Sequence, residues 1–272
     1  MAISETVELL GKGLYDNIPN TLTLKGIPTS IELETVGNED FDKTMLEIVL
    51  PQAVEEKIDF GQLLEIDFQW ILRCLRLLNY GPYHSSNAIF CDACNKTSFG
   101  DYLVDLRTIE CKPLPPNFRN DIVIDKDEFI DFDGSVHLKL LTVRDALNAK
   151  KDKAFQDSEG NVNSNLARIC YSISSIKGNK NLTPVELKLL LVDEMSSADY
   201  MILKGKAREL SDYGLRSGGV ATCPKCGNRE AAFIAFVDDR FFRPSMGALL
   251  EWKNDRNSRR DEDASGSETA AV

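Results

Sequence analysis

Two Cys-x-x-Cys pairs, separated by about 130 residues of intervening chain, constrain this fold more than any other feature. The first pair is Cys91 and Cys94, in CDACNK, and the second is Cys223 and Cys226, in CPKCGN. This spacing lets one short turn present two sulfur atoms to one ion, and four thiolates complete the tetrahedral shell of a structural zinc. We therefore expect the four cysteines to share one zinc ion, which would join two distant segments.

The residues around each pair suit a tight turn over a metal. Pro224 stiffens the second turn, and Gly227 allows its backbone to fold back. Asn95 stands at the matching place of the first turn and also tolerates a positive φ. We expect two β-hairpins with zinc knuckles at their tips, forming a split ribbon over about residues 87–107 and 217–242.

Other uses of the cysteines are less favoured. A redox dithiol would be expected within a βαβ pattern, which neither pair shows, and disulfides require an oxidising compartment, for which the first residues show no secretory signal. Two separate metal sites would need further ligands, and only His84 is near. We expect His84 to be a surface or loop histidine. Cys74, Cys111 and Cys170 lack pair spacing, and the apolar surroundings of Cys74 and Cys170 predict buried thiols.

The overall composition indicates an ordinary globular protein. Its 272 residues are 43% hydrophobic and 28% charged, with a net charge of −11 and a pI near 4.8. No apolar run is long enough to span a membrane. The densest basic cluster, at Arg256, Arg259 and Arg260, is offset by neighbouring acidic residues. The charge distribution therefore argues against non-specific binding to nucleic acid. An acidic chain of this kind suits protein partners better.

The chain carries separate runs of strand and helix patterns, which predict an α+β fold. Residues 41–50 read as a strand, and 51–81 carry the longest helical pattern, ended by a Gly-Pro pair. Short alternating segments follow at 121–140, and helix starts follow at Thr142 and Thr183. The fold class is therefore a split four-cysteine zinc ribbon joining β-hairpins, with an inserted α/β region and a long helix in the N-terminal half.

This pattern divides the chain into three parts. Residues 1–40 would form an N-terminal arm, with a hairpin pairing the alternating segments 21–25 and 30–35. Residues 41–252 would form a single α+β domain that contains the split ribbon. Residues 253–272 are polar and lack aromatic side chains, which predicts a disordered tail.

No catalytic constellation is evident in the sequence. It has no GxxxxGK[ST], no GxGxxG after a strand and no HExxH. Neither His84 nor His137 stands beside a nucleophile with a third orienting group, so a catalytic triad is unsupported. The HxE or CxE pattern of zinc deaminases is absent as well. A zinc ion closed by four sulfurs has no open position for a substrate, so we expect no enzyme activity.

A series of further motifs accompanies the cysteine pairs. They are, in order, Asp67, Arg73-x-x-Arg76 and Asn79-Tyr80-Gly81 in the long helix, Val104-Asp105-Leu106 after the first pair, Leu141-Thr142-Val143-Arg144-Asp145 at a helix start, and Phe241-Phe242-Arg243-Pro244-Ser245 after the second pair. This layout, over roughly residues 40–246, resembles the baseplate hub and hub assembly proteins of T-even-type contractile-tailed phages. Members of that family differ in whether the cysteines are present, so the zinc prediction rests on cysteine spacing alone.

The resemblance implies a non-catalytic structural or assembly component of the phage baseplate hub. Its partners would be other tail and hub proteins, with the tape-measure protein as a further candidate, and no nucleic acid or membrane span. It would be assembled in the cytoplasm of the host bacterium and act in the virion tail. Phe241 and Phe242 are the best candidate contact patch, although strand aromatics also pack into cores.

An alternative is a zinc-ribbon protein associated with nucleic acid or transcription. A basic ribbon face would favour that function. The cations near the cysteine pairs are Lys96, Arg107, Lys225 and Arg229, which are too few to be persuasive.

Overall fold

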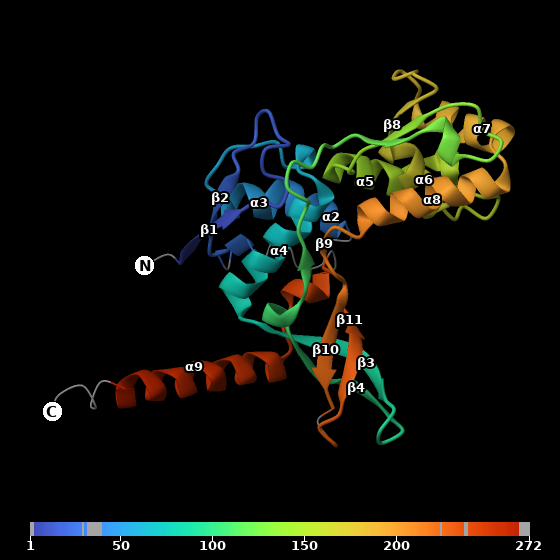
Figure 1. The fold of residues 1–272 in the computed structure, drawn as a ribbon. Helices are drawn as coiled ribbons and strands as arrows, with labels where there is room; N and C mark the ends of the chain where they lie inside the picture. The colour runs from blue at the N-terminus through green and yellow to red at the C-terminus, as the bar shows by residue number, and fades with distance from the viewer. Residues whose placement is uncertain (1–2, 29, 32–39, 224, 237–238, 267–272) are drawn as a thin grey trace.

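The structure is a computed structural model that describes residues 3–28, 30–31, 40–223, 225–236 and 239–266. It combines helices with small antiparallel sheets, so the α+β class is confirmed. Buried apolar side chains form three clusters, in the N-terminal part, in a helical middle part and in the sheet that carries both cysteine pairs. The middle part and this sheet extend in different directions from the N-terminal part (Figure 1).

The N-terminal part surrounds one long helix, α4. Its elements are β1 (Ser4–Glu8), β2 (Thr21–Lys25), α2 (Phe41–Thr44), a π-helical turn (Met45–Val49), α3 (Leu50–Ala53), a 3₁₀ turn (Phe60–Gln62) and α4 (Glu65–Tyr80). The helix predicted within 51–81 is confirmed over the range of α4. Phe68, Ile71 and Leu75 lie on its buried face. Gly81, with a φ of 73°, ends the helix, because most other residues avoid that conformation.

Strand pairing at the N-terminus differs from the prediction. β2 pairs with β1 and not with the segment 30–35, most of which lies outside the described residues. Leu22 and Leu24 are fully buried in the same cluster as the side chains of α4. The carboxylate of Asp67, on α4, also accepts hydrogen bonds from the backbone N–H of Gly11. The residues predicted as an arm therefore form part of the N-terminal core.

Residues 41–50, predicted as a strand, are helical. Asp40 caps α2 by accepting a hydrogen bond from the backbone N–H of Lys43. Pro51 lies in α3, directly after the π-helical turn, within a helical run that is continuous from Phe41 to Ala53. The proline that was interpreted as the end of a strand therefore lies inside a helical segment.

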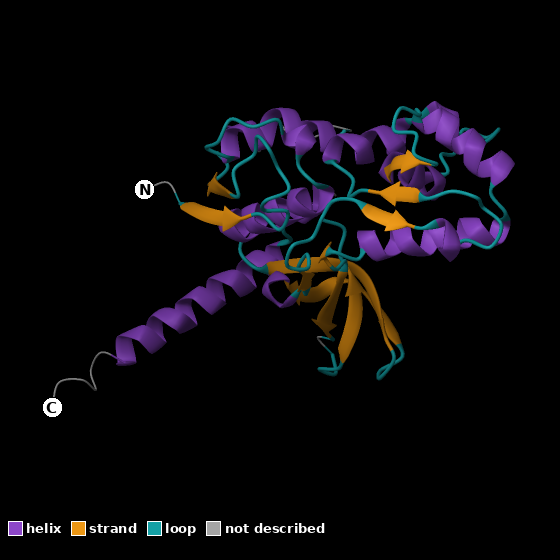
Figure 2. Cartoon of the chain, turned by 45° about the horizontal axis from the view of Figure 1, so that its top comes forward, coloured by secondary structure: helices purple, strands orange, loops and turns teal. Residues whose placement is uncertain are grey.

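The middle part is an insertion between the two halves of the four-stranded sheet. Its elements are β5 (Cys111–Lys112), β6 (Ile122–Ile124), a 3₁₀ turn (Lys126–Glu128), β7 (Val136–Leu138), α5 (Val143–Lys151), a 3₁₀ turn (Lys153–Phe155), α6 (Ser164–Ser172), β8 (Ile173–Ile176), α7 (Pro184–Glu194), α8 (Ser197–Ser211) and β9 (Gly214–Leu215). β5 pairs with β9, so the insertion leaves and returns at one place. Helices surround the β6-β7-β8 sheet (Figure 2). The caps predicted at Thr142 and Thr183 are confirmed.

Both cysteine hairpins belong to a single sheet. It has the order β11-β10-β4-β3, built from β3 (Tyr83–Cys91), β4 (Lys96–Asp105), β10 (Gly218–Thr222) and β11 (Arg229–Phe233). Ala221 on β10 pairs with Val104 on β4, which joins the two hairpins. A 3₁₀ turn follows β4 (Leu106–Thr108) and another precedes the last helix (Asp239–Phe242).

The prediction of a disordered tail from residue 253 is wrong for 253–266, because helix α9 (Met246–Gly266) includes them. Six of the fourteen residues 253–266 are Arg, Lys, Glu or Ala, which have high helix propensity, and polarity alone does not prevent a helix. α9 projects from the body (Figure 1), and Trp252 packs against Gly81. Residues 267–272 lie outside the described part. Among the described residues, no helix combines the length and apolar character needed to cross a membrane.

Candidate metal centre

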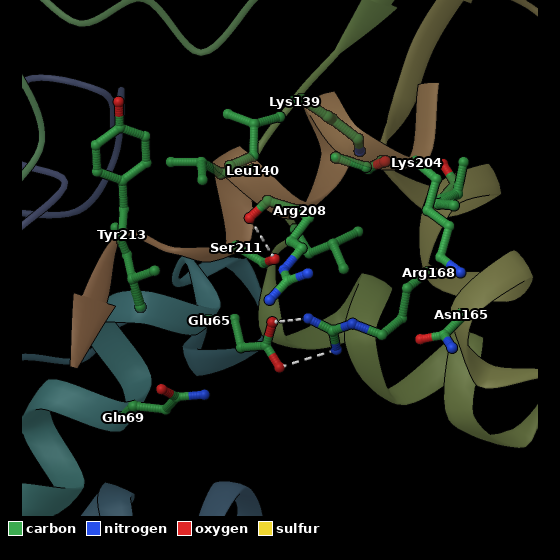
Figure 3. A pocket seen from close by; sticks show the side chains of 16 residues that line it. Glu65, Gln69, Lys139, Leu140, Asn165, Arg168, Lys204, Arg208, Ser211 and Tyr213 are labelled. Carbon is green, nitrogen blue, oxygen red and sulfur yellow. Dashed lines mark hydrogen bonds and ion pairs between the residues drawn. The ribbon is translucent and has the colours of Figure 1, made fainter. Parts of the chain in front are cut away.

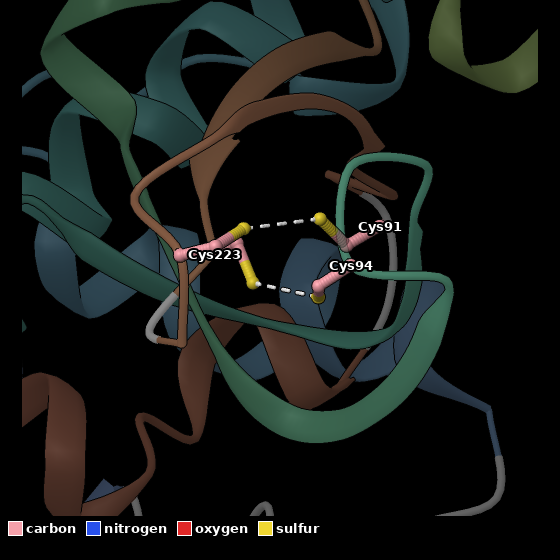
Figure 4. A group of neighbouring side chains, drawn as sticks. Cys91, Cys94 and Cys223 are labelled. Atoms are coloured by element: carbon pink, nitrogen blue, oxygen red, sulfur yellow. Dashed lines mark hydrogen bonds between the residues drawn. The ribbon is translucent and has the colours of Figure 1, made fainter.

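The two cysteine pairs lie at the tips of adjacent hairpins, each in a turn with one left-handed residue. In the first turn Asn95 has a φ of 50°, and in the second Gly227 has a φ of 74°. The backbone N–H of Gly227 also donates to the carbonyl of Cys223 at 2.8 Å. Both turns therefore fold back in the manner that the sequence predicted, and they point the sulfur atoms toward each other (Figure 4).

The four sulfur atoms form one compact group. The Sγ atoms of Cys91, Cys94, Cys223 and Cys226 all lie within 4.8 Å of one another. Across the hairpins, Cys91 Sγ is 3.5 Å from Cys226 Sγ, and Cys94 Sγ is 3.9 Å from Cys223 Sγ (Figure 4). All four cysteines are free thiols. These separations far exceed the disulfide bond length of about 2.05 Å.

The group has the dimensions of a tetrahedral metal site. Zn–S bonds of about 2.3 Å in a tetrahedron place sulfur atoms roughly 3.8 Å apart. The two distances across the hairpins, 3.5 and 3.9 Å, bracket that value. Within the described part of the chain, no other group of three or more His, Cys, Asp and Glu side chains is close enough to share an ion. The arrangement can therefore bind one metal ion with all four cysteines.

Proton affinity differs sharply among these thiols. The hydroxyl of Tyr102 donates to Cys223 Sγ at 3.4 Å, which stabilises the thiolate and lowers the pKa of Cys223 to about 6. Burial raises the pKa of Cys91 to about 12, because it removes water from the thiolate. A divalent metal would supply positive charge and allow all four thiols to ionise. Metal binding at this centre would accordingly release protons.

Two supporting residues were not found by sequence reasoning. Tyr102, on β4, is fully buried beside Cys223. Glu230, on β11, accepts from the backbone N–H of Asp92 at 3.0 Å and from the side-chain amide of Asn228 at 2.6 Å, so it ties the first turn to the second hairpin. Neither position carries a local signal, because each depends on contact between hairpins that are distant in sequence.

The remaining cysteines and histidines stand apart from the sulfur group. Cys74 and Cys170 are buried, as predicted, and Cys111 is half-buried. His84 lies in strand β3, and its ring is half-buried against Phe241, with centroids 5.6 Å apart, so it is not the surface or loop histidine that was expected. His137 Nδ1 lies 2.9 Å from Asp121 Oδ1 at the surface.

Several motif residues converge on a second point, at the base of the four-stranded sheet. The fully buried guanidinium of Arg76 donates to the carbonyls of Gly81 at 2.7 Å, Tyr83 at 2.6 Å and Phe241 at 2.8 Å. Arg73 donates to the carbonyl of Leu106 at 3.0 Å. These bonds join α4 to the start of the first hairpin and to the segment after the second.

The predicted Phe241–Phe242 contact patch is therefore wrong for Phe241. Phe241 is fully buried and packs edge-on against Phe236, with centroids 5.3 Å apart. Phe242 is half-buried and packs near Phe41, at 6.2 Å. The alternative interpretation, in which these aromatics pack into the core, accounts for Phe241.

Comparison with known protein families, with curated proteins and with solved structures gives no match to this chain.

Proposed function

We propose that Cys91, Cys94, Cys223 and Cys226 bind one structural zinc ion. The observation that carries this is the compact sulfur group, in which each cysteine offers one ligand atom. Four-sulfur coordination by Cys-x-x-Cys turns is typical of zinc. Purified protein should contain about one zinc per chain, released when a mercurial reagent blocks the thiols. A protein that binds iron or no metal after purification would contradict the assignment.

We further propose that the chain is a non-catalytic structural or assembly component of the baseplate hub of a contractile-tailed phage. Support comes from the order of sequence motifs, and from the contacts that Arg73 and Arg76 make with the NYG, VDL and FF motifs at one junction. Four of the motifs that carry the resemblance thus meet at one junction. Its role would be in protein–protein contacts in the tail, with assembly in the bacterial cytoplasm.

An exposed apolar face on α7 also supports a role in binding other proteins. Val185, Leu189 and Val192 follow one another at helical spacing and are 43%, 55% and 63% exposed. Apolar side chains in such a row are typical of surfaces that pack against a partner. Because only the other side of α7 is buried, this face would be available for a partner in the free protein.

The test is affinity capture of the tagged chain from cells that produce the whole particle, with mass spectrometry of the bound proteins. Tail hub, wedge or tape-measure proteins should be recovered. A variant with Leu189→Ser and Val192→Ser should recover less of them while keeping its zinc. Recovery of nucleic acid or polymerase subunits without tail proteins would contradict the proposal and favour a transcription-associated zinc ribbon.

A further inference from the structure

A cavity of about 390 Å³ lies where the N-terminal and middle parts meet. It is bounded by the start of α4, the segment after β7, and the helices α6 and α8. Ligand pockets commonly occur at such junctions and have volumes of about 300–1,000 Å³. The polar side chains that define its chemistry are Glu65, Lys139, Arg168, Lys204, Arg208 and Tyr213 (Figure 3).

The lining is strongly cationic. Four of its side chains are Lys or Arg and one is Glu, so four positive charges face one negative charge. This excess of three positive charges contrasts with the net charge of −11 for the whole chain. Such a local reversal of sign concentrates anions at the pocket.

Within the described residues, two of the four cations form a salt bridge. Arg168 binds both oxygens of Glu65, at 3.0 and 2.5 Å, and Lys139 binds Asp145 at 2.9 Å. For Lys204 and Arg208 the described residues provide no ion pair. Asp212, at the end of α8, forms its salt bridge with Lys112 at 2.8 Å, and it also attracts Arg208 at longer range.

Lys204 and Arg208 repel each other, and a bound anion would remove this repulsion. The two residues are four positions apart on α8, so both face the pocket, and like charges at this spacing destabilise a helix. The negative end of the helix dipole favours Arg208 in the last turn but does not reach Lys204 in mid-helix. In Figure 3 the side chains of Arg168 and Arg208 both extend toward Glu65, and only Arg168 forms an ion pair with it.

Part of the lining forms an apolar wall. Ile66, Leu140 and Ile169 are buried residues that line the cavity, while the Asn165 amide and the Ser211 hydroxyl supply neutral polar groups. An apolar wall with a few convergent polar groups is the usual composition of a small-molecule site. A bare inorganic ion would leave this wall uncovered.

We propose that this pocket binds a small organic anion, with its phosphate or carboxylate group on Lys204 and Arg208 and its carbon skeleton against the apolar wall. Guanidinium and ammonium groups form charge-assisted hydrogen bonds to both kinds of oxyanion. The site is separate from the sulfur group, and it does not depend on the function proposed for the whole chain.

The test is calorimetric titration of the full chain at constant ionic strength with two probes, phenyl phosphate and phthalate. The tighter-binding probe identifies phosphate or carboxylate as the preferred group. In the double variant Lys204→Gln, Arg208→Gln the affinity should fall at least tenfold, because two charge-assisted contacts are removed. The Glu65→Gln variant should bind more tightly, because Arg168 is then free to contact the anion.

A matched control separates the pocket from the effect of overall charge. Lys153 and Lys180 are exposed, lie outside the pocket, and make no salt bridge within the described residues. The double variant Lys153→Gln, Lys180→Gln should therefore keep its affinity. Equal weakening in both double variants, weaker binding by Glu65→Gln, or no saturable binding of either probe would overturn the proposal, provided that circular dichroism shows folded variants.

Discussion

Arg76 is a buried cation whose partners are backbone carbonyls. Burial lowers its pKa to about 10, so it still carries its charge at neutral pH. Three carbonyl oxygens, from Gly81, Tyr83 and Phe241, surround the guanidinium and replace its water. A buried charge is tolerated only when such hydrogen bonds satisfy it. The residue therefore acts as the joint between α4 and the four-stranded sheet.

Replacement of Arg76 by Met should lower the free energy of unfolding by about 3 kcal/mol or more, because three buried carbonyls lose their donor. Arg73→Met is the matched control. Arg73 is half-buried and makes one carbonyl bond, so a loss of about 1 kcal/mol is expected. Urea unfolding followed by circular dichroism measures both. Equal losses would show that Arg76 has no special part in the joint.

Two buried aspartates have pKa values that are shifted in opposite directions. Asp67 and Asp199 are both fully buried and both accept backbone N–H bonds from a neighbouring loop. Burial raises the pKa of Asp67, and the bonds from Tyr15 and the loop only partly offset it. Burial also raises the pKa of Asp199, but the hydrogen bonds from Ile130, Ser196 and the rest of the loop outweigh this effect. The net result is a lowered pKa.

The directions of these two pKa shifts predict how the stability of two variants depends on pH. The lowered pKa of Asp199 contributes stability that is present above the ordinary Asp pKa of about 4 and is lost as pH falls through the folded value. Asp199→Asn should thus lower Tm most at neutral pH, with the difference from wild type shrinking in acid. Asp67→Asn should show the reverse trend, since wild type gains stability as Asp67 is protonated. Thermal melts from pH 3 to 7 test both, and parallel curves would contradict the assignment.

Substitution of one sulfur ligand should remove the metal. Cys223→Ser is expected to lose its zinc and to melt at a lower temperature, because binding free energy at a structural zinc is folding free energy. Cys111→Ser, at a half-buried thiol outside the sulfur group, is the control and should retain the metal. Elemental analysis and differential scanning calorimetry provide the measurements. Full metal content with an unchanged Tm in Cys223→Ser would refute four-cysteine coordination.

Among the elements, α9 depends on one glycine of another segment. A Cβ atom at Gly81 would lie 2.4 Å from the ring of Trp252, and the φ of Gly81 is +73°. Trp252 is thus seated directly on the backbone that ends α4. This contact explains how a helix rich in charged residues is attached to the body at its first turns.

The change Gly81→Ala should displace Trp252 and release α9, which faster proteolysis within 246–266 would report. Gly178→Ala provides the control, because Gly178 has a similar φ of +76° but nothing within 4 Å of its Cβ position. It incurs only the backbone strain, about 1 kcal/mol. If both variants were cleaved alike, contact with Trp252 would not be what holds α9.

The elements also show how far the sequence could predict this fold. Local signals succeeded: α4, the caps at Thr142 and Thr183, and the cysteine turns follow from neighbouring residues. Non-local contacts did not: nothing near Thr21–Lys25 indicates that it pairs with β1. The sulfur group was predictable because metal-ligand spacing carries its own chemistry. The cationic pocket was not, because its residues come from four separate segments.

In the whole molecule, the sheet and the middle part have separate cores, so the metal should support them unequally. The sulfur group connects only the two hairpins of the sheet, whereas the middle part has its own apolar cluster. Removal of the metal with a chelator should therefore speed hydrogen exchange in β3, β4, β10 and β11 first, with α6 and α8 protected longer. Exchange mass spectrometry measures this order. Uniform loss of protection would mean that the metal stabilises the chain as one unit.

The joint at Arg76 has a consequence for the order of events during synthesis. The carbonyl of Phe241 that Arg76 requires lies 165 positions further along the chain. At roughly 5–20 residues per second, translation reaches it on the order of ten seconds after α4 is made. Until then the ribosome holds a nascent chain with two of the four cysteines and without one of the three carbonyls that bind Arg76. The middle part can fold during this interval, but the four-stranded sheet can close only near the end of translation.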